Sequence, residues 1–225
     1  MFAILSAGIA PAIALLSFFY LKDKFTEPIP LILRTFILGA LLVFPLMFIQ
    51  YVFNAEFLGN HPFLQSFLII ALTEEFFKWF IFFYVIYNHS EFDAHYDGIV
   101  YAVSISLGFA TLENILYLLA NGIEHAFSRA LFPVSSHALF GVIMGYYFGK
   151  AKMNGIHKKR NLTLAFILPF LLHGTYNYML NVIESNWLIL LIPFMIGLWF
   201  IALRRVKIAN EPHPDFIFQQ EKEQV

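Results

Sequence analysis

Three ionisable side chains lie close together in the middle of an apolar stretch of the chain. Glu74, Glu75 and Lys78 fall within residues 63–87, which are otherwise largely apolar. An ionisable side chain at the centre of a bilayer costs about 2.5–3.5 kcal/mol on insertion scales, so such groups normally pair inside the protein and serve a function. Neighbouring carboxylates can act as a general base or as metal ligands. We therefore expect a buried functional site here.

Polar side chains occur at a similar depth on three further apolar stretches. Glu113, His137 and His173 each lie well inside such a stretch, and Asn177 follows His173 by four residues. With a helical rise of about 1.5 Å per residue, these groups reach the central or outer part of a membrane, as the paired glutamates do. Residues four apart share one face of a helix. The sequence thus predicts that four helices bring acids and imidazoles to one site.

Such a group of side chains could activate water for hydrolysis of a peptide bond with the help of a metal ion. In this mechanism His137, His173 and either Glu75 or Glu113 hold Zn²⁺, and Glu74 is the general base. A divalent cation would relieve the repulsion among three buried acids, which favours this mechanism slightly. The close-spaced His-Glu-x-x-His signature of many zinc proteases is absent from the sequence.

A mechanism without a metal uses the same residues. Here Glu74 and a histidine activate water directly, while Asn177 and His173 stabilise the oxyanion.

Two functions from other classes of membrane protein also place acids and histidines at the midplane. One is a proton-coupled transporter, against which the lack of an inverted repeat argues mildly, and the other is a non-catalytic receptor or scaffold.

The composition predicts a protein that spans a membrane. Of the 225 residues, 60% are hydrophobic and 13% are charged, and the mean hydropathy is +0.70. Soluble domains carry roughly 25% charged residues. The net charge of −1 and the absence of a basic block argue against a nucleic-acid partner. Without cysteine, disulfides, thiolate metal sites and cysteine nucleophiles are excluded.

The apolar stretches predict an all-α, polytopic transmembrane helix bundle with about seven spans. These are residues 1–21, 31–53, 63–87, 97–120, 127–149, 162–181 and 187–206. All but two of the 14 Lys and Arg residues follow the first, fifth and seventh spans, the exceptions being Lys78 and Arg129. The positive-inside rule then predicts an external N-terminus and a cytoplasmic C-terminus. The connection at residues 88–97 is the weak point of this topology, because it has neither Lys nor Arg.

Two smaller features complete the organisation of the chain. Gly141, Gly145 and Gly149 recur every fourth residue, which is typical of closely packed membrane helices. Asp97 begins a span, where an acid is favoured by the helix dipole. We expect one membrane domain over residues 1–209, and a flexible cytoplasmic tail over residues 210–225.

Several motifs together resemble the PrsW family over nearly the whole chain. They are Glu74-Glu75-Phe-Phe-Lys78, Asp97-Gly-Ile-Val-Tyr101, Phe109-Ala-Thr-Leu-Glu113 with Asn114, His137, and His173-Gly-Thr-Tyr-Asn177. The resemblance implies an intramembrane protease of the bacterial cytoplasmic membrane, with a single-pass anti-sigma factor as its substrate. It further implies that the enzyme makes the first, external-side cut in regulated intramembrane proteolysis during a stress response.

The family pattern transfers to this chain residue by residue. Glu74 and Glu75 match the paired glutamates of the family, and His173 matches the histidine of its last motif. Glu113 stands where the distantly related CAAX prenyl proteases have a histidine, so His137 or His173 would have to supply that imidazole. Asn177 stands where PrsW relatives can carry Asp. The resemblance therefore implies a glutamate-dependent protease, with Lys78 close to its paired acids.

Overall fold

The described part of the computed structural model covers residues 1–24, 26–55, 61–153, 157–183 and 185–211, and it is helical throughout with short connections. The predicted tail therefore lies almost entirely outside the described residues. The main helices are α1 (Phe2–Tyr20), α2 (Ile29–Leu41), α3 (Val43–Phe53), α4 (Leu72–Ile81), α5 (Asp97–Asn121), α6 (Ala126–Arg129), α7 (Ser135–Met153), α8 (Lys158–Val182) and α9 (Leu188–Ala209). The predicted all-α helix bundle is confirmed.

Each of the seven predicted spans corresponds to helical structure. The third consists of α4 with π-helical turns on either side, η2 (Leu64–Ala71) and η3 (Phe82–Ile86). The fifth adds the short segments η4 (Ile123–His125) and η5 (Ala130–Val134) to α6 and α7. Five of the seven are long and apolar enough to cross a membrane by length and composition. The other two are the segment around α4 and helix α8. The α4 segment carries Glu74 and Glu75, and α8 begins with a basic turn.

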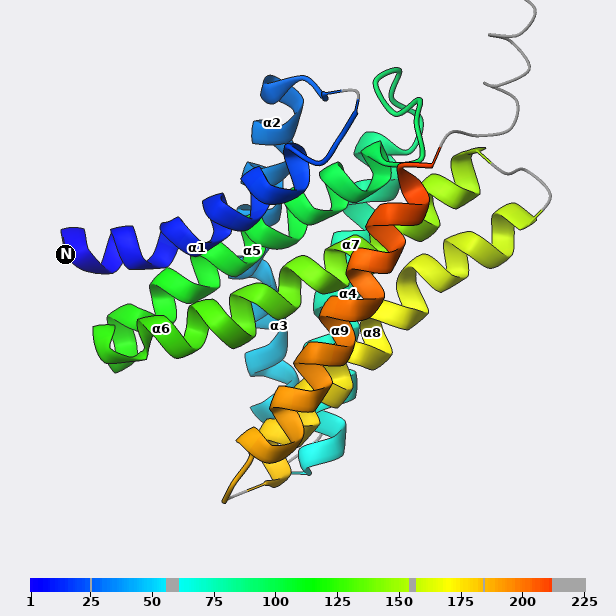
Figure 1. Cartoon of the computed structure of the whole chain (residues 1–225). Helices are drawn as coiled ribbons and strands as arrows, with labels where there is room; N and C mark the ends of the chain where they lie inside the picture. Colours follow the sequence, from blue (N-terminus) through cyan, green and yellow to red (C-terminus); the bar gives the residue numbers. More distant parts are fainter. Residues whose placement is uncertain (25, 56–60, 154–156, 184, 212–225) are drawn as a thin grey trace, which may run out of the picture.

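Helices α5 and α7 form the centre of the bundle, with α1, α2, α8 and α9 around them (Figure 1). A side chain at Gly145 would meet the backbone of Gly98, and one at Gly149 would meet the backbone of His95. The predicted small-residue face of α7 therefore lets its backbone approach α5 closely. This close packing fixes the positions of the polar residues that both helices carry.

The break between α2 and α3 is explained by one proline. Pro45 lies in the first turn of α3 and has no backbone N–H, so it cannot continue the helical hydrogen bonds of α2. Helix α2 accordingly ends at Leu41 and α3 begins at Val43. Helix α3 lines one side of the cavity described below.

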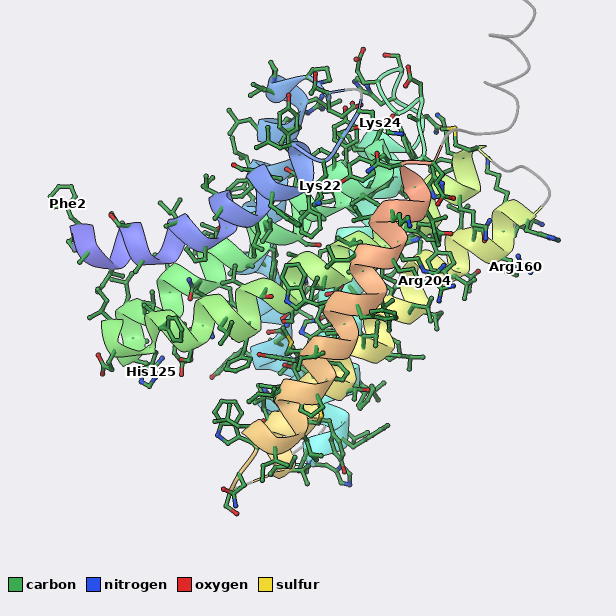
Figure 2. All side chains as sticks on the ribbon, viewed as in Figure 1. Phe2, Lys22, Lys24, His125, Arg160 and Arg204 are labelled. Atoms are coloured by element: carbon green, nitrogen blue, oxygen red, sulfur yellow. The ribbon has the colours of Figure 1, made fainter. Side chains whose placement is uncertain are left out.

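The basic connections lie together at one end of the bundle. The Lys24 Nζ donates to the Asn210 carbonyl oxygen at 2.8 Å, which joins the connection after α1 to the end of α9. The Lys152 Nζ donates to the Tyr87 carbonyl oxygen at 2.8 Å. The connection at residues 88–97, which has neither Lys nor Arg, therefore begins at the same end of the bundle. Figure 2 shows Phe2 and His125 far from Lys22, Lys24 and Arg160. The N-terminus thus lies at the opposite end of the bundle from the basic connections and the end of α9, as an odd number of spans requires. Which end faces the cytoplasm stays a prediction.

Candidate active site

The acidic pair and the lysine of α4 form a buried charge cluster. Because residues three and four apart share a helix face, Lys78 reaches both acids. Its Nζ lies 2.8 Å from Glu75 Oε1 and 3.4 Å from Glu74 Oε2. Glu75 and Lys78 are fully buried, and Glu74 is 6% exposed. The ammonium also lies over the Phe109 ring, 4.3 Å from its centroid. The cluster is therefore held by ion pairs, as expected for charges at this depth.

His137 connects this cluster to a second acid on α5. The Lys78 Nζ lies 3.2 Å from His137 Nδ1, and His137 Nε2 lies 3.1 Å from Glu113 Oε2. Since an ammonium can only donate, Nδ1 accepts from Lys78 and the Nε2–H donates to Glu113. Arg129 then binds the other oxygen of Glu113 at 3.1 Å. The tautomer of His137 is thus fixed from both sides.

His173 approaches the same cluster from α8. Its Nδ1 lies 2.9 Å from Glu75 Oε1, and its ring stacks on Phe140 with centroids 5.2 Å apart. The rings of His137 and His173 lie 5.1 Å apart. A carboxylate that accepts from one ring nitrogen leaves the other nitrogen with its lone pair available. Glu75 therefore orients His173 so that Nε2 is its reactive nitrogen.

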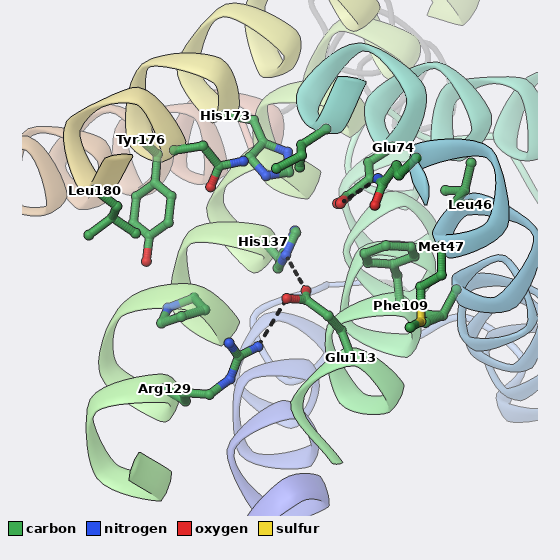
Figure 3. A pocket seen from close by; sticks show the side chains of 15 residues that line it. Leu46, Met47, Glu74, Phe109, Glu113, Arg129, His137, His173, Tyr176 and Leu180 are labelled. Atoms are coloured by element: carbon green, nitrogen blue, oxygen red, sulfur yellow. Dashed lines mark hydrogen bonds and ion pairs between the residues drawn. The ribbon is translucent and has the colours of Figure 1, made fainter. Parts of the chain in front are cut away.

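These side chains border a cavity of about 240 Å³. Helix α3 closes one side of it with Val43, Leu46, Met47 and Gln50, and the other lining residues include Glu74, Glu113, Arg129, His137, His173, Tyr176, Asn177 and Leu180. Figure 3 shows the carboxylates, imidazoles and the Arg129 guanidinium around this space. Glu75 and Lys78 are fully buried and are not part of the lining. The cavity thus offers one carboxylate of the acidic pair to a substrate.

Some polar groups of the cavity were not identified from the sequence. The Tyr176 hydroxyl is buried and has no hydrogen-bond partner among the described residues, and Figure 3 shows it pointing into the cavity. Arg129 bonds Asn114 Oδ1 at 2.9 Å in addition to Glu113. Gln50 donates to Glu74 Oε1 at 3.3 Å. A signal was present for Arg129, since it is the one Lys or Arg of its connection. Tyr176 lies within the motif that runs from His173 to Asn177, but nothing in the sequence marked its hydroxyl as a group of the site.

Comparison with known proteins agrees with this arrangement. A family described as PrsW family intramembrane metalloprotease matches residues 27–203. The chain belongs to the PrsW family. It is 68% identical to Protease PrsW of Oceanobacillus iheyensis over 94% of this chain and 98% of that protein, and 56% identical to Protease PrsW of Bacillus subtilis over 93% and 97%. Protease PrsW of Clostridioides difficile is 33% identical over 83% and 82%. No solved structure matches the chain.

Membership of the PrsW family makes the protein an intramembrane protease and a multi-pass protein of the cell membrane. The four helices α4, α5, α7 and α8 bring together the charged and imidazole groups on which our reading of the sequence rested. Asn177 lies in the cavity lining. In this PrsW member two glutamate–histidine pairs are present, one between Glu113 and His137 and one between Glu75 and His173.

The donor set of this PrsW protease suits a metal ion. Glu74, Glu75, His137 and His173 each offer one ligand atom, and these atoms lie within 4.8 Å of one another. Two imidazoles with carboxylates are a common catalytic zinc site. Glu75 Oε2 is buried without a hydrogen-bond partner among the described residues, so one acceptor is available for a cation. Glu113, which the sequence also suggested as a ligand, is outside this group of four and pairs with Arg129 and His137.

Proposed function

We propose that the protein is a glutamate-dependent metalloprotease that hydrolyses a peptide bond of a single-pass membrane protein, with Glu74 as the general base. The position of Glu74 carries this proposal. Of the two adjacent acids it is the one that borders the cavity, beside the two histidines, whereas Glu75 is fully buried. A general base must come within hydrogen-bond reach of the water that it deprotonates.

The other residues of the cluster divide the remaining tasks. Glu75 orients His173, and Lys78 holds both acids of α4 in place. Glu75, His137 and His173 would hold the metal and leave Glu74 free as the base, and zinc is the best fit to two imidazoles and a carboxylate. A zinc ion held there supplies Lewis-acid polarisation of a water molecule or a carbonyl oxygen.

Oxyanion stabilisation requires donors on the other side of the reacting carbonyl. Asn177 borders the cavity one helical turn beyond His173. The Tyr176 hydroxyl is aimed into the same space, so it is placed to donate to the substrate carbonyl. We assign both side chains to the binding of the substrate carbonyl. The leaving amine can then take its proton from Glu74 after that acid has deprotonated the water.

The place of the cavity along the helices supports a cut on the external side. His137 lies in the first turn of α7, whereas Lys150 and Lys152 lie in its last turn at the basic end. The cavity is therefore far from the connections that the positive-inside rule assigns to the cytoplasm. Together with the resemblance described above, this supports an anti-sigma factor as the substrate and the first cut of regulated intramembrane proteolysis as the reaction.

The test is reconstitution of the full chain in lipid vesicles with a single-pass anti-sigma-type substrate. Wild type should cleave the substrate outside the predicted cytoplasmic face, and Glu74→Gln and His173→Ala should not. Glu124→Gln and His61→Ala are matched controls, because both side chains are exposed and neither lines the cavity. Equal cleavage by Glu74→Gln and wild type would refute the assignment of the base.

Metal analysis decides between the two mechanisms that the sequence leaves open. The purified wild-type protein should contain zinc, and a strong chelator should remove both the zinc and the activity. Activity that persists in the chelator with no bound zinc would establish the mechanism in which Glu74 and a histidine activate water directly.

A further inference from the structure

A second group of acids lies at the basic end of the bundle, apart from the catalytic cavity. Asp23 and Glu27 belong to the connection between α1 and α2, and Asp97 is the first residue of α5. Each offers a carboxylate oxygen, and these oxygens lie within 4.8 Å of one another. Glu27 is 6% exposed and Asp97 is fully buried. Three acids gathered in this way repel one another unless a positive charge lies between them.

Asp97 lies in the first turn of α5, as expected, but its side chain does not cap the helix. The residue before it, Tyr96, has the cap position, and no side chain caps the helix. Asp97 Oδ2 instead accepts from the backbone N–H groups of Asp93 at 3.0 Å and Ala94 at 2.5 Å. Its other oxygen, Oδ1, is buried and has no hydrogen-bond partner among the described residues. Asp97 therefore brings an unused acceptor to the group of acids.

The neighbouring cations are engaged elsewhere. The Lys22 ammonium lies over the Phe18 ring, 4.9 Å from its centroid, and the Lys24 ammonium donates to the Asn210 carbonyl oxygen. Within the described ranges, no Lys or Arg nitrogen lies within 4.0 Å of a carboxylate oxygen of Glu27 or Asp97. Glu27 and Asp97 are thus buried without a cationic side chain beside them in this part of the chain.

The surroundings of Glu27 show that this arrangement is electrostatically strained. Glu27 is buried, and its carboxylate lies within reach of the like-charged Asp97 and Asp23. The Tyr101 hydroxyl donates to Glu27 Oε2, and the Tyr20 hydroxyl donates to its backbone carbonyl at 3.2 Å. These neutral donors hold Glu27 in place beside Asp97 and bring no positive charge of their own.

We propose that Asp23, Glu27 and Asp97 bind a hard divalent cation, Mg²⁺ or Ca²⁺, that joins the connection after α1 to the start of α5. Three carboxylates without imidazole or thiolate are the ligand set of these ions and not of zinc. Calcium–oxygen distances of about 2.3–2.6 Å place opposite ligands about 4.6–5.2 Å apart, and magnesium requires about 4.0–4.2 Å. Oxygens that all lie within 4.8 Å of one another are close enough to share one such ion.

This site differs from the catalytic donor set in position, ligand type and expected metal. The cation would hold Asp97, and with it the N-terminal turn of α5, the helix that carries Glu113 farther along. Anything that binds the folded state and not the unfolded state raises stability in proportion to the logarithm of its concentration. The full chain should therefore gain thermal stability from Mg²⁺ or Ca²⁺ independently of zinc.

The test uses chelator-treated full-length protein in detergent, titrated separately with MgCl₂ and CaCl₂. Isothermal calorimetry should show one saturable equivalent in wild type, and the unfolding temperature should rise with cation concentration. Glu27→Gln and Asp97→Asn should each weaken binding by about tenfold or more, because affinity follows the number of charged ligands. Glu91→Gln, an exposed acid of the neighbouring connection, and Glu74→Gln in the catalytic cavity should bind as wild type does.

Three results would overturn the proposal. The first is the absence of saturable binding to wild type. The second is unchanged binding in Glu27→Gln, which decides the question alone if Asp97→Asn does not fold. The third is loss of the calcium or magnesium equivalent in Glu74→Gln, which would move the binding to the catalytic cavity.

Discussion

Replacement of Lys78 by methionine tests whether its ammonium and a metal ion occupy the same set of ligands. The Lys78 Nζ contacts Glu75 Oε1 at 2.8 Å, Glu74 Oε2 at 3.4 Å and His137 Nδ1 at 3.2 Å. These are three of the four candidate metal ligands. Methionine keeps much of the length of the side chain and removes its charge. The ammonium therefore neutralises the acids that the proposed metal ion would bind.

The size of the effect follows from the burial of the pair. At 2.8 Å and an effective dielectric constant of about 20, the attraction between Lys78 and Glu75 is about 6 kcal/mol. Removal of one partner of a buried ion pair typically destabilises a protein by about 3–5 kcal/mol, because the other charge stays buried. For a chain of this length the loss corresponds to a fall in unfolding temperature on the order of 10 °C. We expect this fall in the metal-free protein.

The same substitution should strengthen zinc binding. Without the ammonium, zinc meets two uncompensated carboxylates. Lys78→Met should therefore bind zinc more tightly than wild type, by about tenfold or more. Thermal unfolding in chelator and at saturating zinc, with zinc titrations by calorimetry, measures both effects without use of proteolytic activity. The variant should be much less stable than wild type in chelator and should recover most of the difference in zinc.

Lys159→Met is the matched control, because Lys159 is exposed at the start of α8 and is remote in sequence from the acids of α4. It should unfold and bind zinc as wild type does. If Lys78→Met were equally destabilised with and without zinc, and its zinc affinity matched that of wild type, the ammonium and the metal would not share ligands. The reasoning would then be refuted.

Three further predictions concern other parts of the molecule. Burial, followed by the charges of Asp97 and Asp23, raises the pKa of the Glu27 carboxyl to about 8, so the folded state binds an extra proton from about pH 5 to about pH 8. In chelator, the unfolding temperature of wild type should therefore fall as pH rises over this range. Glu27→Gln should flatten this profile. Gly145→Val should lower the unfolding temperature strongly, since a Cβ there meets the α5 backbone, whereas Gly197→Ala, with open space at its Cβ, should leave it unchanged or slightly higher. Arg129→Gln should reduce the cleavage rate in vesicles and destabilise the protein by about 1–3 kcal/mol, because Glu113 loses its charged partner.

Much of the fold is predictable from the sequence because the bilayer imposes strong limits on it. Apolar stretches of the required length become helices, since no water satisfies the backbone within the hydrocarbon. The predicted polar residues are unusual for the same reason, because charged groups such as Glu74 and Glu75 are rarely tolerated there without partners. Hydropathy alone therefore indicated both the helices and the residues that meet between them.

The contacts within the site were not predictable in the same way. Depth along a helix follows from residue number, but rotation about its axis does not, and α5 and α7 are buried nearly all round, so they have no apolar face to fix it. Arg129 reaches Glu113 because the segment from η4 to η5 folds back beside α5. The Tyr176 hydroxyl faces the cavity through the rotation of α8. Such orientations depend on packing between helices far apart in the sequence.

The charges of the catalytic cluster explain why it should attract a cation or a proton. Among the described residues that line or adjoin the cavity, three carboxylates face two cationic side chains, because Lys78 serves both acids of α4 and Arg129 serves Glu113. One negative charge is therefore left over in a largely apolar environment, where it is expensive. Glu74 has the longer of the two contacts with Lys78 and borders the cavity, so the excess charge is concentrated at its carboxylate. A carboxylate at that position can act as the base on a water molecule, and the excess charge of the cluster favours a metal ion beside it; peptide hydrolysis can use both.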